Sequence, residues 1–95
     1  MVLEIPSDKS QVVLFKSPSC GNCERLLPIF QEAIMPYQDK IKTKIVDITQ
    51  DMDSAVHYGV FSVPTVIFFK NGQETARLPG IASRDKITNL LQQIL

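Results

Sequence analysis

The fold of this chain is decided by the stretch SPSCGNCE, residues Ser17 to Glu24, which contains the only two cysteines, Cys20 and Cys23. The preceding segment Gln11–Phe15 is a short apolar run typical of a buried strand. Apolar residues at helical spacing follow, namely Leu26, Leu27, Ile29, Phe30, Ala33 and Ile34. The two thiols therefore lie where a buried strand turns into a helix. A Cys-x-x-Cys at such a junction predicts a redox-active pair.

Size and charge limit the classes of function that the chain can have. Its 95 residues suffice for one domain with a modest core, expected over residues 1–95. Ten basic and ten acidic side chains give a net charge of zero, which provides no field to attract nucleic acid or an anionic membrane. No apolar run is long enough to span a bilayer, and the first residues lack the pattern of a signal peptide. We therefore expect a cytoplasmic protein, whose two cysteines are chemical rather than structural.

The remaining sequence predicts alternating strands and helices. Strands are expected at residues 11–16, 42–48, 65–69 and 73–78. Helices are expected at residues 21–35, at residues 52–58 and after residue 83. Asn71-Gly72 predicts a tight hairpin between the last two strands, and Ser83 is expected to cap the last helix. The apolar stripe of that helix is Ile87, Leu90, Leu91, Ile94 and Leu95, whereas Val2–Ile5 fits either a short strand or a helical turn.

At this point the order of elements resembles the thioredoxin-like family, over a span from about Gln11 to Leu95. The resemblance rests on the strand before the CGNC motif, on Pro28 in the following helix and on Gly80 before the last helix. Three further motifs are Tyr58-Gly59-Val60, Val63-Pro64-Thr65 and Phe69-Lys70-Asn71-Gly72-Gln73. A single Cys-x-x-Cys is a weak signal, but its combination with these motifs is specific.

The resemblance implies an α/β fold of the thioredoxin-like type. We expect a central mixed sheet of about four strands flanked by helices, with the first and last helices on opposite faces or edges. The family's first strand and helix would be missing or reduced to Val2–Ile5, which gives a shortened N-terminus. The resemblance also implies a cis bond between Val63 and Pro64, close to the cysteines.

The sequence departs from the family at three places. The usual Trp-Cys-Gly-Pro-Cys is Ser-Cys-Gly-Asn-Cys at residues 19–23, and the chain has no tryptophan. The buried acid that thioredoxins carry before the motif corresponds to Leu14, and the lysine that accompanies it corresponds to Ile45. The fold and the redox pair do not depend on these residues, whereas the family's usual specificity does.

The position of the cysteines predicts a different role for each. Cys20 stands at the start of a helix, where the backbone N–H groups of Asn22 and Cys23 can point at its sulfur and favour the thiolate. We therefore expect a lowered pKa for Cys20, the exposed nucleophile. Cys23, one turn further on, is expected to be more buried and to resolve the mixed disulfide by attacking Cys20.

The resemblance implies a shallow groove for a protein or peptide disulfide, formed by Phe61, Val63, Pro64, Gly80 and Ile81. Val63 can offer its backbone to an extended peptide segment. Three residues are expected to tune the thiols. Gly21 leaves space for an incoming disulfide, Asn22 restores an N–H that proline lacks and is expected to make the pair more oxidising, and Lys16 adds positive charge.

The sequence therefore predicts a thiol–disulfide oxidoreductase with a part in electron transport and cell redox homeostasis. It needs no bound cofactor or metal, and its electrons come from a reductase or a small thiol. We expect a monomer that binds neither nucleic acid nor membrane. Two alternatives stay open: a glutaredoxin-like, glutathione-coupled reductase, and a non-catalytic peptide-binding module. His57, the only histidine, is expected on the surface.

Overall fold

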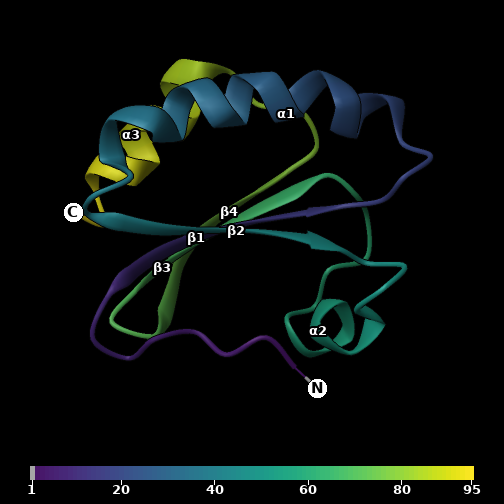
Figure 1. Ribbon diagram of the computed structural model, residues 1–95, viewed down its shortest axis with the longest axis horizontal. Helices are drawn as coiled ribbons and strands as arrows, with labels where there is room; N and C mark the ends of the chain where they lie inside the picture. Colours follow the sequence, from purple (N-terminus) through teal and green to yellow (C-terminus); the bar gives the residue numbers. More distant parts are fainter. Residues whose placement is uncertain (1) are drawn as a thin grey trace.

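A four-stranded sheet with helices on both faces forms the centre of the computed structural model, which describes residues 2–95 (Figure 1). Met1 lies outside the described residues. The elements are β1 (Ser10–Lys16), α1 (Gly21–Ile34), the 3-10 turn η1 (Met35–Tyr37), β2 (Ile41–Asp47), α2 (Met52–His57), β3 (Thr65–Lys70), β4 (Gln73–Pro79) and α3 (Arg84–Gln92). All predicted strands and helices are confirmed, and the predicted ends differ from the observed ones by at most one residue. Among the described helices, none is both long and apolar enough to cross a bilayer.

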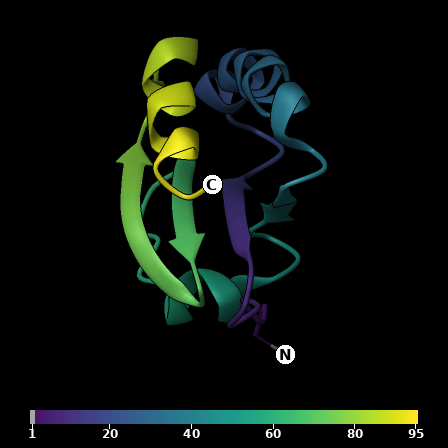
Figure 2. The same cartoon turned by 90° about the vertical axis from the view of Figure 1, so that its left-hand side faces the viewer.

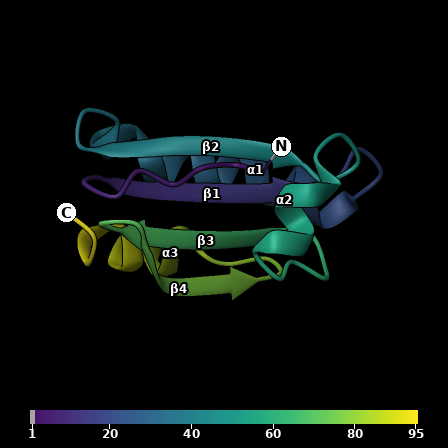
Figure 3. The ribbon, with the colours of Figure 1, turned by 90° about the horizontal axis from the view of Figure 1, so that it is seen from below.

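The strand order in the sheet is β2-β1-β3-β4 (Figure 3). β1 and β2 are parallel and are connected through α1, whereas β3 pairs antiparallel with both β1 and β4. A parallel pair requires such a crossover helix. The register places Lys16 beside Asp47 and Phe15 beside Thr65. The ends of β1 and β2 and the start of β3 therefore meet at one end of the sheet.

The first and last helices pack side by side on the same face of the sheet, so the expectation of opposite faces or edges was wrong (Figures 1 and 2). One apolar cluster joins them to the sheet. Its fully buried members are Val12, Leu14, Leu26, Phe30, Val66, Phe68, Ile87, Leu91 and Ile94. The stripe of α3 needs a wide apolar partner, and the face that already carries α1 offers it. Leu95, expected in that stripe, is half exposed.

The opposite face of the sheet is covered by α2 and by the N-terminal segment. Val2–Ile5 forms neither a strand nor a helical turn, so both expectations for it were wrong. The Leu3 N–H donates to Ser54 Oγ at 2.7 Å, and the Tyr58 hydroxyl donates to the Leu3 carbonyl. The backbone N–H and carbonyl of Leu3 are thus satisfied by side chains rather than by a strand edge, while Leu3 and Ile5 pack on the apolar cluster of this face.

Turn residues end the elements as the sequence predicts. Asn71 and Gly72 have φ values of +53° and +83° and connect β3 to β4. Gly59, with φ +67°, follows the end of α2. Ser83 caps α3, where its hydroxyl oxygen accepts the Lys86 N–H at 3.1 Å.

Asp51 caps the start of α2. Its carboxylate accepts the Ser54 N–H at 3.1 Å and the Ser54 hydroxyl at 2.6 Å, and these hydrogen bonds lower the pKa of Asp51. Hydrogen bonds from the hydroxyl and N–H of Thr49 likewise lower the pKa of Asp47, with a smaller contribution from Lys16. In their ionised forms, both carboxylates therefore stabilise the folded chain relative to the unfolded chain.

The lowered pKa values predict that the fold loses stability in acid. A carboxyl group whose pKa in the folded state is below its unfolded value of about 3.9 stabilises the fold above that pH. This stabilisation is lost as the pH falls through the folded-state pKa. We expect Asp51→Ala to lower stability near neutral pH and to reduce the loss between about pH 5 and pH 2. Urea unfolding across this range tests both effects, with the exposed Asp85→Ala as the control. An unchanged pH dependence in Asp51→Ala would contradict the assignment.

Candidate redox site

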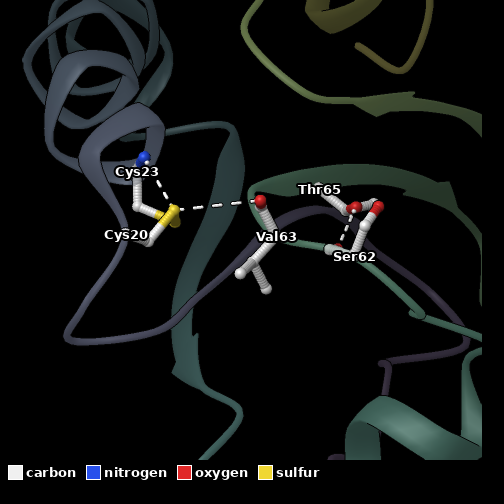
Figure 4. Close-up of a disulfide and its surroundings, with 5 residues drawn as sticks. All are labelled: Cys20, Cys23, Ser62, Val63 and Thr65. Atoms are coloured by element: carbon white, nitrogen blue, oxygen red, sulfur yellow. Dashed lines mark hydrogen bonds between the residues drawn. A yellow bond between two sulfur atoms is a disulfide. The ribbon is translucent and has the colours of Figure 1, made fainter.

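Cys20 and Cys23 form a disulfide at the start of α1, with their Cα atoms 5.2 Å apart (Figure 4). Cys20 is the N-cap residue and has an extended backbone, while Cys23 lies in the first helical turn. The loop from β1 and the first turn of the helix together fix this separation. This separation brings the two sulfurs close enough to bond, as the predicted redox-active pair requires.

The helix start directs a backbone donor at the sulfur of Cys20. The Cys23 N–H donates to Cys20 Sγ at 3.0 Å, and the Glu24 N–H donates to the Cys20 carbonyl at 3.1 Å. The N–H groups of Asn22 and Cys23 were the expected donors to this sulfur, and the structure shows the hydrogen bond from Cys23. Sulfur here occupies the place that an oxygen of serine or aspartate takes in ordinary N-caps. Such a donor, together with the positive end of the helix, stabilises a thiolate more than a thiol.

The two sulfurs differ in their access to solvent. Cys20 is partly exposed, whereas Cys23 is only 4% exposed on the face of α1 that packs on the sheet. An incoming disulfide can therefore reach Cys20 first. This asymmetry agrees with the predicted division between a nucleophile and a resolving thiol.

The segment before β3 lies beside the disulfide (Figure 4). The Val63 carbonyl oxygen is 3.8 Å from Cys20 Sγ, and the Val63–Pro64 bond is cis, as expected. The Thr65 hydroxyl donates to the Ser62 carbonyl at 2.8 Å, and the Gly80 N–H donates to the Pro64 carbonyl at 2.7 Å. These contacts join the segment to β3 and to the end of β4, and they bring three parts of the chain together.

The other expected groove residues adjoin these contacts in the sequence. Gly80 has φ +82° and is tied to Pro64, as described above. Ile81, which follows it, is 45% exposed. Phe61 is 95% exposed, more than any other large apolar side chain among residues 2–95. An aromatic ring in water two residues before Val63 is available for contact with a bound chain.

The three expected tuning residues lie around the thiols in different ways. Gly21 and Asn22 are exposed, and a Cβ atom added at Gly21 would meet nothing within 4 Å, so the approach to the disulfide is open. Lys16 lies beside Asp47 across the β1–β2 pair and lowers the pKa of that carboxyl group. Its charge is therefore shared with Asp47, which reduces what it can contribute to the sulfurs.

The resemblance assigns the positions of the family's buried acid and lysine to Leu14 and Ile45. These two residues are register partners in β1 and β2, so the two positions lie side by side. Leu14 is fully buried in the cluster that carries α1, and Ile45 is 37% exposed. The sheet beneath α1 thus offers an apolar side chain where an acid could exchange a proton.

Sequence analysis did not single out Arg77. Its guanidinium donates to the carbonyls of Tyr58 and Gly59 at 2.8 and 3.2 Å, and it also binds Glu74. The contact joins β4 to the end of α2, and no linear motif predicts it. His57 is exposed, as expected, and its ring contacts Tyr58 edge-on at 4.7 Å between centroids. Residues 2–95 contain no group of three His, Cys, Asp or Glu side chains placed to hold a metal ion.

Comparison with known proteins agrees with this geometry. The Thioredoxin family model matches residues 2–93. The M-type chloroplastic thioredoxin of Pisum sativum is 31% identical over 98% of this chain, which spans 54% of that protein. Thioredoxin 1 of a Nostoc species is 31% identical over 96% of this chain and 85% of its own length.

A Rickettsia typhi thioredoxin is 30% identical over 94% of this chain and 85% of its own length. The crystal structure of the Malassezia sympodialis thioredoxin Mala s 13 superposes with a TM-score of 0.79 at 30% identity, and the match covers 94% of this chain and 77% of that one. The matched regions include the two cysteines at the start of α1 and the cis-proline segment beside them. The chain therefore belongs to the thioredoxin family and is a thiol–disulfide oxidoreductase.

Proposed function

We propose that this protein exchanges its dithiol with disulfides of proteins or peptides, with Cys20 as the nucleophile and Cys23 as the resolving thiol. The observation that carries the proposal is the 3.0 Å hydrogen bond from the Cys23 N–H to Cys20 Sγ, at a partly exposed helix start. This donor favours the thiolate of Cys20 in the reduced protein. Burial of Cys23 makes it the second thiol to react.

The exchange transfers two electrons in two balanced steps. The Cys20 thiolate attacks one sulfur of the substrate disulfide, which forms a mixed disulfide and releases the other substrate sulfur as a thiolate. Cys23 then loses its proton and attacks Cys20 Sγ, which forms the Cys20–Cys23 disulfide and releases the second substrate thiol. The substrate is reduced and the protein is oxidised. A protein reductase or a small thiol returns the two electrons.

The helix start assists the first step in both directions. When the released substrate thiolate attacks the substrate sulfur of the mixed disulfide, the first step runs in reverse, and Cys20 is the leaving sulfur that takes up negative charge. The Cys23 N–H lies 3.0 Å from that sulfur already in the disulfide form. A leaving thiolate of low pKa departs faster. One backbone donor therefore supports both directions of the first step.

An extended peptide is the substrate that best fits the surface around Cys20. The Val63 carbonyl oxygen is 3.8 Å from Cys20 Sγ and is a hydrogen-bond acceptor for a strand-like partner. The exposed side chains of Phe61 and Ile81 offer apolar contact beside it. Gly21 and Asn22 beside Cys20 are exposed, and this open approach suits a flexible macromolecular substrate. A cytoplasmic location and a monomeric state stay predictions.

Trapping experiments test the assignment of the two cysteines. With the Cys23→Ser variant and a disulfide-bonded protein such as insulin, we expect a stable mixed disulfide, because the resolving sulfur is absent. Cys20→Ser is expected to form no such adduct. In an insulin-reduction assay driven by dithiothreitol, we expect this variant to be inactive. Non-reducing electrophoresis and mass spectrometry identify the adduct. Trapping through Cys23 instead, or full activity of Cys20→Ser, would reject the assignment.

The same assay distinguishes this proposal from the two alternatives. Turnover supported by glutathione but not by a thioredoxin reductase would indicate a glutaredoxin-like reductase. Peptide binding without turnover in the native chain, matched by the double variant Cys20→Ser/Cys23→Ser, would indicate a binding module. The proposal predicts turnover with a protein reductase and its loss in Cys20→Ser.

Leu14 allows a test of how Cys23 loses its proton. We expect Leu14→Asp to change the rate of the resolving step more than that of the first attack, because a buried carboxyl group can accept the Cys23 proton. Leu14→Asn is the matched control, with similar volume and no titration. Both variants are expected to lose about 3 kcal/mol of stability, since each places a polar group in an apolar cluster.

Stopped-flow measurement of attack and resolution as a function of pH separates the two rates. A pH-dependent gain in resolution for Asp over Asn is the expected result. Equal effects of the two substitutions on both steps would show that proton transfer to this position does not matter.

A further inference from the structure

The placement of Val63 beside Cys20 depends on a segment that has no regular secondary structure. Residues 60–64 form the last part of the connection from α2 to β3, and the far end of this segment is fixed by the Thr65–Ser62 and Gly80–Pro64 hydrogen bonds. The near end needs an equivalent attachment, since a chain held at one end only can swing. The backbone supplies part of it, where the Val60 N–H donates to the Ala55 carbonyl at 2.8 Å.

Arg77 supplies the rest of this attachment. Its Nη2 donates to the Tyr58 carbonyl at 2.8 Å and its Nη1 donates to the Gly59 carbonyl at 3.2 Å. These carbonyls follow the last turn of α2, where partial negative charge accumulates and a cation is favoured. Arg77 therefore connects the edge strand β4 directly to the two residues that precede the segment.

Glu74 holds the guanidinium in the orientation that this attachment needs. Its two carboxylate oxygens accept Arg77 Nε and Nη2, each at 2.7 Å. This two-point contact fixes the plane of the fork and leaves the remaining N–H groups free to point at the Tyr58 and Gly59 carbonyls. Lysine cannot reproduce such an arrangement, because it has one nitrogen in place of the planar fork.

An irregularity in β4 makes the contact between Glu74 and Arg77 possible. Residues three apart on a regular strand point to opposite faces of the sheet. Here the register pairs Ile67 with Arg77 and Phe69 with Glu74, with a shift between Phe68 and Phe69. The two steps from Ile67 to Phe69 on β3 thus lie opposite the three steps from Arg77 to Glu74 on β4. The extra residue, Thr75, returns Glu74 to the face of the sheet that carries α2 and Arg77.

We propose that Glu74 and Arg77 form a positioning pair that holds residues 58–59, and through them sets the place of Val63 beside Cys20 for macromolecular substrates. The inference rests on the proposed function, because it assumes that a bound chain pairs with the Val63 backbone. The pair touches neither sulfur, so it acts through segment 60–64 and not on the exchange itself. A small disulfide that needs only Cys20 does not require it.

The test compares a protein disulfide with a small one in Arg77→Gln, Arg77→Lys and Glu74→Gln. We expect KM for insulin to rise about 3- to 10-fold in Arg77→Gln, because small displacements of positioning groups have effects of this order or larger. The rate with hydroxyethyl disulfide is expected to stay unchanged. Arg77→Lys is expected to resemble Arg77→Gln, whereas Glu74→Gln shows a smaller change of the same kind.

Arg84→Gln is the matched control. It also breaks an arginine–carboxylate ion pair, with Glu32 at 2.6 Å, but that pair joins α3 to a part of α1 that is twelve residues beyond Cys20. All rates are measured well below the Tm of each variant, so that unfolding does not contribute. If Arg77→Gln does not fold, Glu74→Gln decides by the same comparison.

A selective rise of KM for insulin in the Arg77 and Glu74 variants, absent in Arg84→Gln, supports the positioning pair. Equal changes for both disulfides, or no difference from Arg84→Gln, overturn it. The proposed function fails by a different result, namely insulin reduction that survives Cys20→Ser. The two failures are therefore distinguishable in one set of assays.

Discussion

The hydrogen bond from the Cys23 N–H to Cys20 Sγ is the interaction on which the rest of the site depends. It exists because α1 begins immediately after Cys20, so that a free N–H of the first turn points back at the capping side chain. The start of α1 is in turn fixed by β1, whose five central residues are buried on both faces of the sheet. A buried strand thus determines where a helix starts, and the helix start determines the charge state that its sulfur prefers.

Strand order explains why other parts of the chain meet at this sulfur. β1 lies between the parallel β2 and the antiparallel β3, so the end of β1 and the start of β3 share one end of the sheet. The cis-proline segment before β3 therefore lies beside Cys20. The hairpin brings the end of β4 back to this segment, where the Gly80 N–H donates to the Pro64 carbonyl. The Glu74–Arg77 pair on β4 is connected to the same segment through the carbonyls of Tyr58 and Gly59, which follow the end of α2. Local turns and long-range pairing are both needed to complete the surface.

Local patterns predicted most of the fold and the reactive pair. The junction at Cys20, the Asn71-Gly72 turn and the Ser83 cap each depend on residues close in sequence, and the structure confirms all three. The side of the sheet that α3 takes was predicted wrongly, because an apolar stripe says which residues are buried but not against which face. The Arg77 contact could not be predicted, since it requires a residue inserted in β4 to turn Glu74 to the same face.

The pH titration of the reduced protein, followed by the ultraviolet absorbance of the thiolate, tests the central claim most directly. The donor at the helix start predicts that one thiol, identified as Cys20 by its loss in Cys20→Ser, ionises well below the value of about 8.5 for a free cysteine. Cys23, which is buried, is expected to ionise only at higher pH. A Cys20 thiol that titrates at or above the value of a free cysteine would contradict the account.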